Sequence, residues 1–146
     1  MKTKSLLKLR DITRIQSVLK ACKAKEIMEE HVAVANPETE LSKILADMMD
    51  KNLHEIPVLE NDKLVGIASY KTIIQKRNLP LKTKTRSIML PVLDMDEDSN
   101  CIALAESCIS TSFRQIPISK NRRLLGIVFR KALIEIITKI KEFERI

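Results

Sequence analysis

The sequence predicts a mixed α+β fold in which two β-α-β-β-α repeats pack with pseudo-two-fold symmetry, preceded by an N-terminal amphipathic helix. The chain repeats itself at an offset of 60 residues, and each copy holds an apolar-Pro-apolar segment that runs through a polar turn into a second apolar segment. This pattern is typical of a hairpin, and the flanking segments have the apolar spacing of helices. The offset gives nine identical pairs: Val32/Val92, Ile56/Ile116, Pro57/Pro117, Asn61/Asn121, Leu64/Leu124, Gly66/Gly126, Ile67/Ile127, Lys71/Lys131 and Ile74/Ile134. Because one such unit rarely buries its apolar face alone, we expect the two repeats to face one another across clefts.

The segment before the repeats, residues 1–22, is predicted to be a helix over residues 5–22. Apolar residues recur there at steps of three and four, with basic residues between them. We expect this helix to cover an edge of the repeats or to mediate oligomerisation. Its apolar positions are Leu6, Leu9, Ile12, Ile15, Leu19 and Cys22.

The first repeat is assigned to residues 23–80. It is predicted to contain a helical turn at 24–28, strands at 32–35, 54–59 and 64–68, and helices that begin near residue 38 and at residue 69. Ser69 is a plausible N-cap for the second of these helices. The inward stripe of the first helix is predicted to comprise Leu41, Ile44, Leu45, Met48 and Met49.

The second repeat is assigned to residues 81–146, after a linker in which Pro80 prevents the helix from continuing. Strands are predicted at 92–95, 114–119 and 124–129, and the last helix is longer than its counterpart in the first repeat. The intervening helix is predicted to turn Ala103, Leu104, Cys108 and Ile109 inward.

Composition narrows the classes of function. Hydrophobic residues make up 45% of the chain, enough for a core, and a net charge of +7 favours phosphate-bearing partners. Only 3% of residues are aromatic, which argues against single-stranded nucleic acid, because its bases need stacking platforms. Cys22, Cys101 and Cys108 have no metal-like spacing, so a reducing, cytoplasmic location is expected, and no membrane span or signal peptide is recognised. His31 and His54 lack partners at ligand spacing, so neither a catalytic constellation nor a metal site is expected.

Four motifs in this order, repeated in tandem over roughly residues 23–140, resemble the CBS domain pair, or Bateman module. In the first repeat they read Lys25-Glu26-Ile27-Met28, Asn36-Pro37-Glu38, Ile56-Pro57-Val58 and Leu64-Val65-Gly66-Ile67-Ala68-Ser69. The resemblance implies a regulatory module and not an enzyme. It further implies a homodimer whose clefts bind AMP, ADP, ATP or S-adenosylmethionine, with no obligatory cofactor, and which reports to a protein that the sequence does not identify.

Many members of that family end the third strand of each repeat with a Gly-containing motif whose Thr or Ser and Asp hold the ribose. The first repeat keeps Ser69 but has Thr72 at the acidic position, whereas the second has Phe129 and Ala132. The resemblance therefore implies that the first-repeat cleft is the main site, and that the second is either empty or filled by Phe129. Base contacts are expected from apolar residues of the strands, namely Val34, Ile56, Pro57, Ile116 and Pro117.

The resemblance also implies candidates for phosphate binding, because some nucleotide-binding members of the family place a basic residue three positions before the hairpin proline. His54 and Arg114 each stand three residues before the hairpin proline, and Lys71 lies within the ribose motif. An arginine can bind a phosphate through two hydrogen bonds. Two alternatives stay open: a ligand-free oligomerisation or protein-interaction module, which the missing acidic residues favour, and a nucleic-acid-associated module, which rests on net charge alone.

Overall fold

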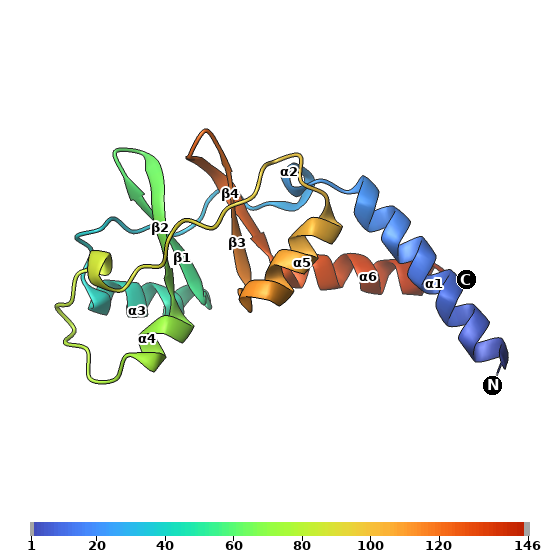
Figure 1. Cartoon of the computed structure of the whole chain (residues 1–146), viewed down its shortest axis with the longest axis horizontal. Coiled ribbons are helices and arrows are strands. Elements are labelled where there is room, and N and C mark those ends of the chain that lie inside the picture. The colour runs from blue at the N-terminus through green and yellow to red at the C-terminus, as the bar shows by residue number, and fades with distance from the viewer. Residues whose placement is uncertain (1, 145–146) are drawn as a thin grey trace.

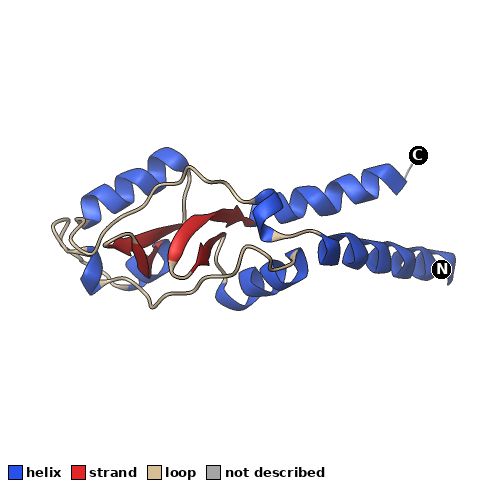
Figure 2. Cartoon of the chain, turned by 90° about the horizontal axis from the view of Figure 1, so that it is seen from above, coloured by secondary structure: helices blue, strands red, loops and turns tan. Residues whose placement is uncertain are grey.

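Two antiparallel hairpins lie side by side at the centre of the molecule, and helices flank them (Figures 1 and 2). The computed structural model describes residues 2–144, and the side chains of residues 12–140 within them. The predicted α+β class is confirmed. The elements are α1 (Lys2–Ala21), α2 (Ala24–Ile27), α3 (Leu41–Lys51), β1 (Glu55–Glu60), β2 (Lys63–Ser69), α4 (Tyr70–Gln75), η1 (Thr85–Ser87), α5 (Cys101–Thr111), β3 (Gln115–Lys120), β4 (Arg123–Phe129) and α6 (Arg130–Glu144).

Each hairpin closes through a two-residue turn with a left-handed backbone. The φ angles are 51° and 63° at Asn61 and Asp62, and 52° and 65° at Asn121 and Arg122. Two consecutive residues with positive φ form a type I′ turn, whose twist matches that of the flanking strands. The turns therefore use these polar residues, and the two glycines of the chain serve another purpose.

The predicted first strand of each repeat is reduced to a single bridging residue. Ala35 forms one parallel bridge with Val58 of β1, and Met95 forms one with Ile118 of β3. In the first repeat the Oδ1 atom of Asn36 accepts the backbone N–H of Glu38 at 2.8 Å, and this turn ends the extended segment. The expectation of strands over residues 32–35 and 92–95 is therefore wrong in extent.

The segment near the start of each repeat pairs with the hairpin of the other repeat. Glu29 and Ile127 of β4 exchange two backbone hydrogen bonds of 2.8 and 2.9 Å, and Leu90 and Ile67 of β2 exchange two of 2.8 and 3.1 Å. A Cβ atom added at Gly126 would lie 2.6 Å from the carbonyl oxygen of Glu29. The repeated glycines are thus required where the exchanged segment crosses the hairpin closely.

Two clusters of buried aliphatic side chains form the core. The cluster of the first repeat includes the predicted positions Leu41, Ile44 and Met48, together with Ile56. The cluster of the second repeat comprises Leu19, Ala24, Ile67, Cys101, Leu104, Cys108, Phe113, Ile116, Ile118, Val128 and Leu133. Because Leu19 of α1 belongs to this second cluster, α1 packs on the second repeat.

Three local expectations are wrong. Met49 and Ile109, predicted to face inward, are 83% and 80% exposed. Each lies at the edge of its predicted apolar stripe, and only the central positions of that stripe are buried. Ser69 occupies the N-cap position of α4, but its side chain forms no capping hydrogen bond.

No helix within residues 2–144 is both long enough and apolar enough to cross a membrane.

Candidate functional site

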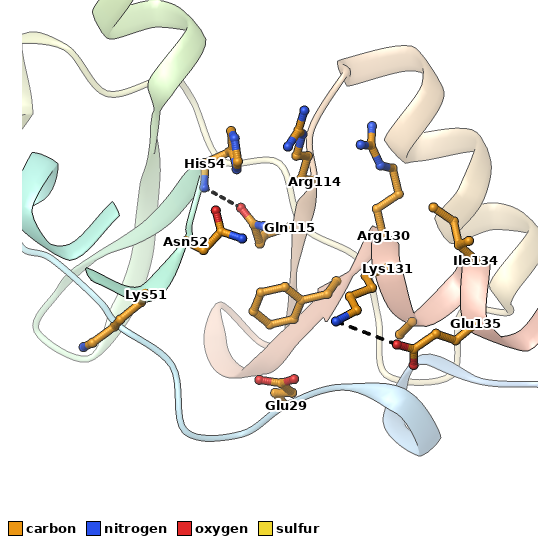
Figure 3. Close-up of a pocket in the computed structure, with 12 residues that line it drawn as sticks. Glu29, Lys51, Asn52, His54, Arg114, Gln115, Arg130, Lys131, Ile134 and Glu135 are labelled. Atoms are coloured by element: carbon orange, nitrogen blue, oxygen red, sulfur yellow. Dashed lines mark hydrogen bonds and ion pairs between the residues drawn. The ribbon is translucent and has the colours of Figure 1, made fainter. Parts of the chain in front are cut away.

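A pocket of about 550 Å³ opens between the two repeats, where strands β1 and β3 begin and β4 ends. Its volume falls within the range of small-molecule sites, roughly 300–1,000 Å³. Phe129 and Ile134 give it an apolar side, and Glu29 lies at another edge (Figure 3). The pocket therefore combines an apolar surface with charged groups, as ligand sites generally do.

Basic side chains dominate the charge of the pocket. Lys51 comes from the end of α3, Arg114 from the residue before β3, and Arg130 and Lys131 from the first turn of α6. Within the described part of the chain, only Lys131 among these has a carboxylate in range, at 4.0 Å from Glu135. Guanidinium groups that face a pocket without forming ion pairs favour a bound anion.

His54 stands beside the two arginines, and their side chains point to the same side of the strands (Figure 3). Burial, followed by the charges of Arg114 and Arg130, lowers the pKa of His54 below its ordinary value. The imidazole is therefore mostly neutral at pH 7. Its Nδ1 atom is buried without a hydrogen-bond partner among the described residues, and its ring meets Tyr70 edge-on with centroids 5.9 Å apart.

The structure brings some of the predicted site residues together and leaves others apart. His54 and Arg114 line the described pocket, and so do Phe129 and Ala132, which replace the ribose-binding residues of the second repeat. Phe129 forms a wall of the pocket and leaves its volume open. The remaining predicted residues do not line it: Val34, Ile56, Pro57, Ser69, Lys71, Thr72, Ile116 and Pro117.

Of these remaining residues, Pro57 and Pro117 are buried in the strands, Lys71 is exposed and Thr72 is half-buried. Ile56 and Ile116 are fully buried in the strand cores, and Ser69 is 2% exposed at the end of β2. Val34 is 44% exposed on the surface. The first-repeat site that would use Ser69 and Thr72 stays a prediction.

Sequence reasoning missed two of the basic residues in the pocket. Arg130 corresponds by the repeat offset to Tyr70, and Lys51 corresponds to Thr111, so neither is a repeated basic position. Both residues were overlooked because the other repeat has no basic residue at the equivalent position. The feature that could have indicated Arg130 is its position directly after Phe129, the last residue of β4.

Comparison with known proteins finds a family match over part of the chain. Residues 24–78 match the model of the CBS domain. An uncharacterised protein of Methanocaldococcus jannaschii is 26% identical over 143 residues, which cover 86% of this chain and 34% of that protein. The chain therefore spans about a third of the length of this relative.

Solved CBS structures share the fold. The CBS domain of a bacterial CNNM/CorC family Mg²⁺ transporter in complex with ATP has a TM-score of 0.72 and 20% identity, with 90% of this chain and 97% of that chain covered. CBSX2 in complex with AMP has a TM-score of 0.67 and 21% identity, with 82% and 98% covered. At this identity the likeness concerns the fold.

Proposed function

We propose that this chain, whose residues 24–78 match the model of the CBS domain, is a regulatory module that binds a phosphate-bearing adenosyl compound in the pocket between its repeats. The observation that carries the proposal is the pair of arginines, Arg114 and Arg130, that lie beside His54 without a carboxylate partner among the described residues. Phe129 and Ile134 offer an apolar surface for a base. The complexes of similar folds with ATP and AMP support the choice of ligand class.

The ligand would act on the relative pose of the two repeats. His54 precedes a strand of the first repeat, whereas Arg114, Arg130 and Phe129 belong to the second. A ligand that contacts both groups favours the pose in which they converge. It can shift the module only by its difference in affinity for the two poses.

Isothermal titration calorimetry with ATP, AMP, S-adenosylmethionine and inorganic tripolyphosphate tests the proposal. We expect saturable binding of ATP near one per chain, and weaker binding of S-adenosylmethionine, because the latter carries no phosphate for the arginines. A protein that binds none of the four contradicts the proposal. A preference for S-adenosylmethionine would show that the two arginines do not take part in ligand binding.

The same titration should depend on pH through His54. A bound phosphate favours the imidazolium, so ATP affinity should rise as pH falls from 7.5 through the lowered pKa of His54, which lies below about 6.5. His54→Gln should remove this rise, whereas the phosphate's own titration persists in both proteins. His31, which is exposed, provides the matched control through His31→Gln.

A second candidate function, self-association, rests on exposed apolar side chains at equivalent positions of the two repeats. Met49 of α3 and Ile109 of α5 are 83% and 80% exposed, and Ile74 and Ile134 are 55% and 54% exposed. Their four helices lie at the end of the strands away from the hairpin turns (Figure 1). We propose that this surface joins two copies of the chain, since an apolar face of this kind marks an interaction site.

Met49→Asp combined with Ile109→Asp should therefore convert a dimer into a monomer. Sedimentation velocity measures the change, since buried charges on both copies oppose association. Leu81→Asp, at a site 61% exposed in the linker, is the control and should leave the dimer intact. A dimer that survives the double substitution would place the interface elsewhere.

A further inference from the structure

Two buried polar side chains at the pocket exchange hydrogen bonds between the repeats. Glu55 and Gln115, the first residues of β1 and β3, occupy equivalent positions, and each is 4% exposed. The Oε1 atom of Gln115 accepts the backbone N–H groups of His54 at 2.8 Å and of Glu55 at 2.9 Å. In return, the Oε1 atom of Glu55 accepts the backbone N–H groups of Arg114 and of Gln115, the latter at 3.0 Å.

These hydrogen bonds hold the backbone of His54 and Arg114, whose basic side chains line the pocket. The N–H of His54 is held by Gln115 of the other repeat, and its carbonyl accepts the N–H of Tyr70 at 2.8 Å. The N–H of Arg114 is held by Glu55, and its carbonyl accepts the N–H of Arg130 at 2.8 Å. Each basic residue is thus fixed on one side by the opposite repeat and on the other by its own.

We propose that Glu55 and Gln115 are positioning residues: a reciprocal latch between the repeats that fixes the backbone from which His54 and Arg114 project into the pocket. A buried N–H without an acceptor is costly, so the four donors hold the repeats in one relative pose. Any sliding of β1 against β3 would leave these donors without acceptors and would separate His54 from Arg114. The effect of the latch on ligand binding rests on the proposed function.

The chemistry of the pair is asymmetric, and this asymmetry makes the latch testable. Burial raises the pKa of Glu55, while the backbone donors and the charges of Arg114 and Arg130 oppose the rise. Because one side chain is a carboxylate and the other is an amide, the two acceptors together bury only one negative charge. Two carboxylates would face one another in a buried place and repel. The latch should therefore tolerate an exchange of the two residues but not a second carboxylate.

The test compares four variants in the full chain. Gln115→Leu removes one acceptor, Gln115→Glu adds a second carboxylate, and Glu55→Gln with Gln115→Glu exchanges the pair. Gln75→Leu, at an exposed glutamine of α4 that does not line the pocket, is the matched control. Thermal unfolding without ligand and calorimetric titration with ATP are measured for each.

We expect both single variants of Gln115 to lower the unfolding temperature and to weaken ATP binding by about tenfold or more, because Gln115→Leu leaves two backbone donors without an acceptor and Gln115→Glu places a second carboxylate beside Glu55. The exchanged pair should recover both values towards the wild type, and Gln75→Leu should change neither. An exchanged pair as impaired as Gln115→Glu alone would overturn the latch, because reciprocity is its essential property.

A third readout needs no ligand and would not respond to a general loss of stability. The chain has two histidines, so NMR titration resolves the imidazoles of His54 and His31. Gln115→Leu should raise the pKa of His54 back towards its ordinary value, since a released His54 is better hydrated and farther from Arg114.

An unchanged titration of His54 in Gln115→Leu would overturn the positioning role. Failure of the wild-type protein to bind ATP would overturn the proposed function instead. In that case the unfolding temperature of the exchanged pair and the titration of His54 still decide whether the latch exists.

Discussion

Gly126→Ala should lower the free energy of unfolding by about 1–3 kcal/mol, the usual cost of overpacking a tight site. The added Cβ would lie 2.6 Å from the carbonyl oxygen of Glu29 and 3.2 Å from the Cγ atom of Met28. The nearer atom belongs to backbone that two hydrogen bonds to Ile127 hold in place, so it cannot move away as a flexible side chain would. Gly126 has no positive φ, so the cost arises from space and not from backbone conformation.

Urea denaturation monitored by circular dichroism measures this change. Gly66→Ala should be destabilising for the same reason, because its Cβ would lie 2.8 Å from the carbonyl oxygen of Leu90. Ser42→Ala, an exposed position in α3, is the control and should stay within about 0.5 kcal/mol of the wild type. A Gly126→Ala protein as stable as this control would show that the segment of Glu29 does not cross β4 so closely.

Arg114→Gln and Arg130→Gln should each weaken ATP binding by about 1.5–3 kcal/mol, which is roughly a tenfold to hundredfold loss of affinity. Neither guanidinium forms an ion pair with a carboxylate of the described residues, so its charge is available to a phosphate. Arg114→Lys keeps the charge but loses the planar pair of donors, and should fall between the wild type and Arg114→Gln.

Adenosine, which carries no phosphate, separates this effect from a general disturbance of the pocket. Calorimetric titration should show that Arg114→Gln and Arg130→Gln reduce ATP affinity and leave adenosine affinity unchanged. Arg123→Gln, exposed at the start of β4 beside the hairpin turn, is the matched control for the loss of one positive charge. Equal losses for ATP and adenosine would contradict a role for these arginines in phosphate binding.

Repetition in the sequence was sufficient to predict the hairpins, and the resemblance to the CBS domain pair singled out His54 and Arg114. These residues recur at a fixed offset, and the structure places both in one pocket. Repetition was insufficient for Arg130, because its equivalent is Tyr70. It was also insufficient for the latch, since a glutamate and a glutamine at equivalent positions do not register as an identity.

Apolar spacing predicted helices correctly but not which edge of a helix is buried. The stripe of α3 was extended to Met49 and that of α5 to Ile109, and both side chains are exposed. Spacing indicates a face without fixing its width, because that width depends on what packs against it. The pairing of Glu29 with Ile127 was not predicted either, since contacts between distant segments leave no local pattern.

The exchanged segments also determine how the chain can fold. Glu29 pairs with Ile127 of β4, and most of both repeats lies between these two residues along the chain. Closing this long loop costs entropy before any contact compensates for it, so folding should be slower than local helices and hairpins would suggest. Neither half, separated at the linker, would hold a finished core, and the two sequence repeats should therefore melt as a single cooperative unit.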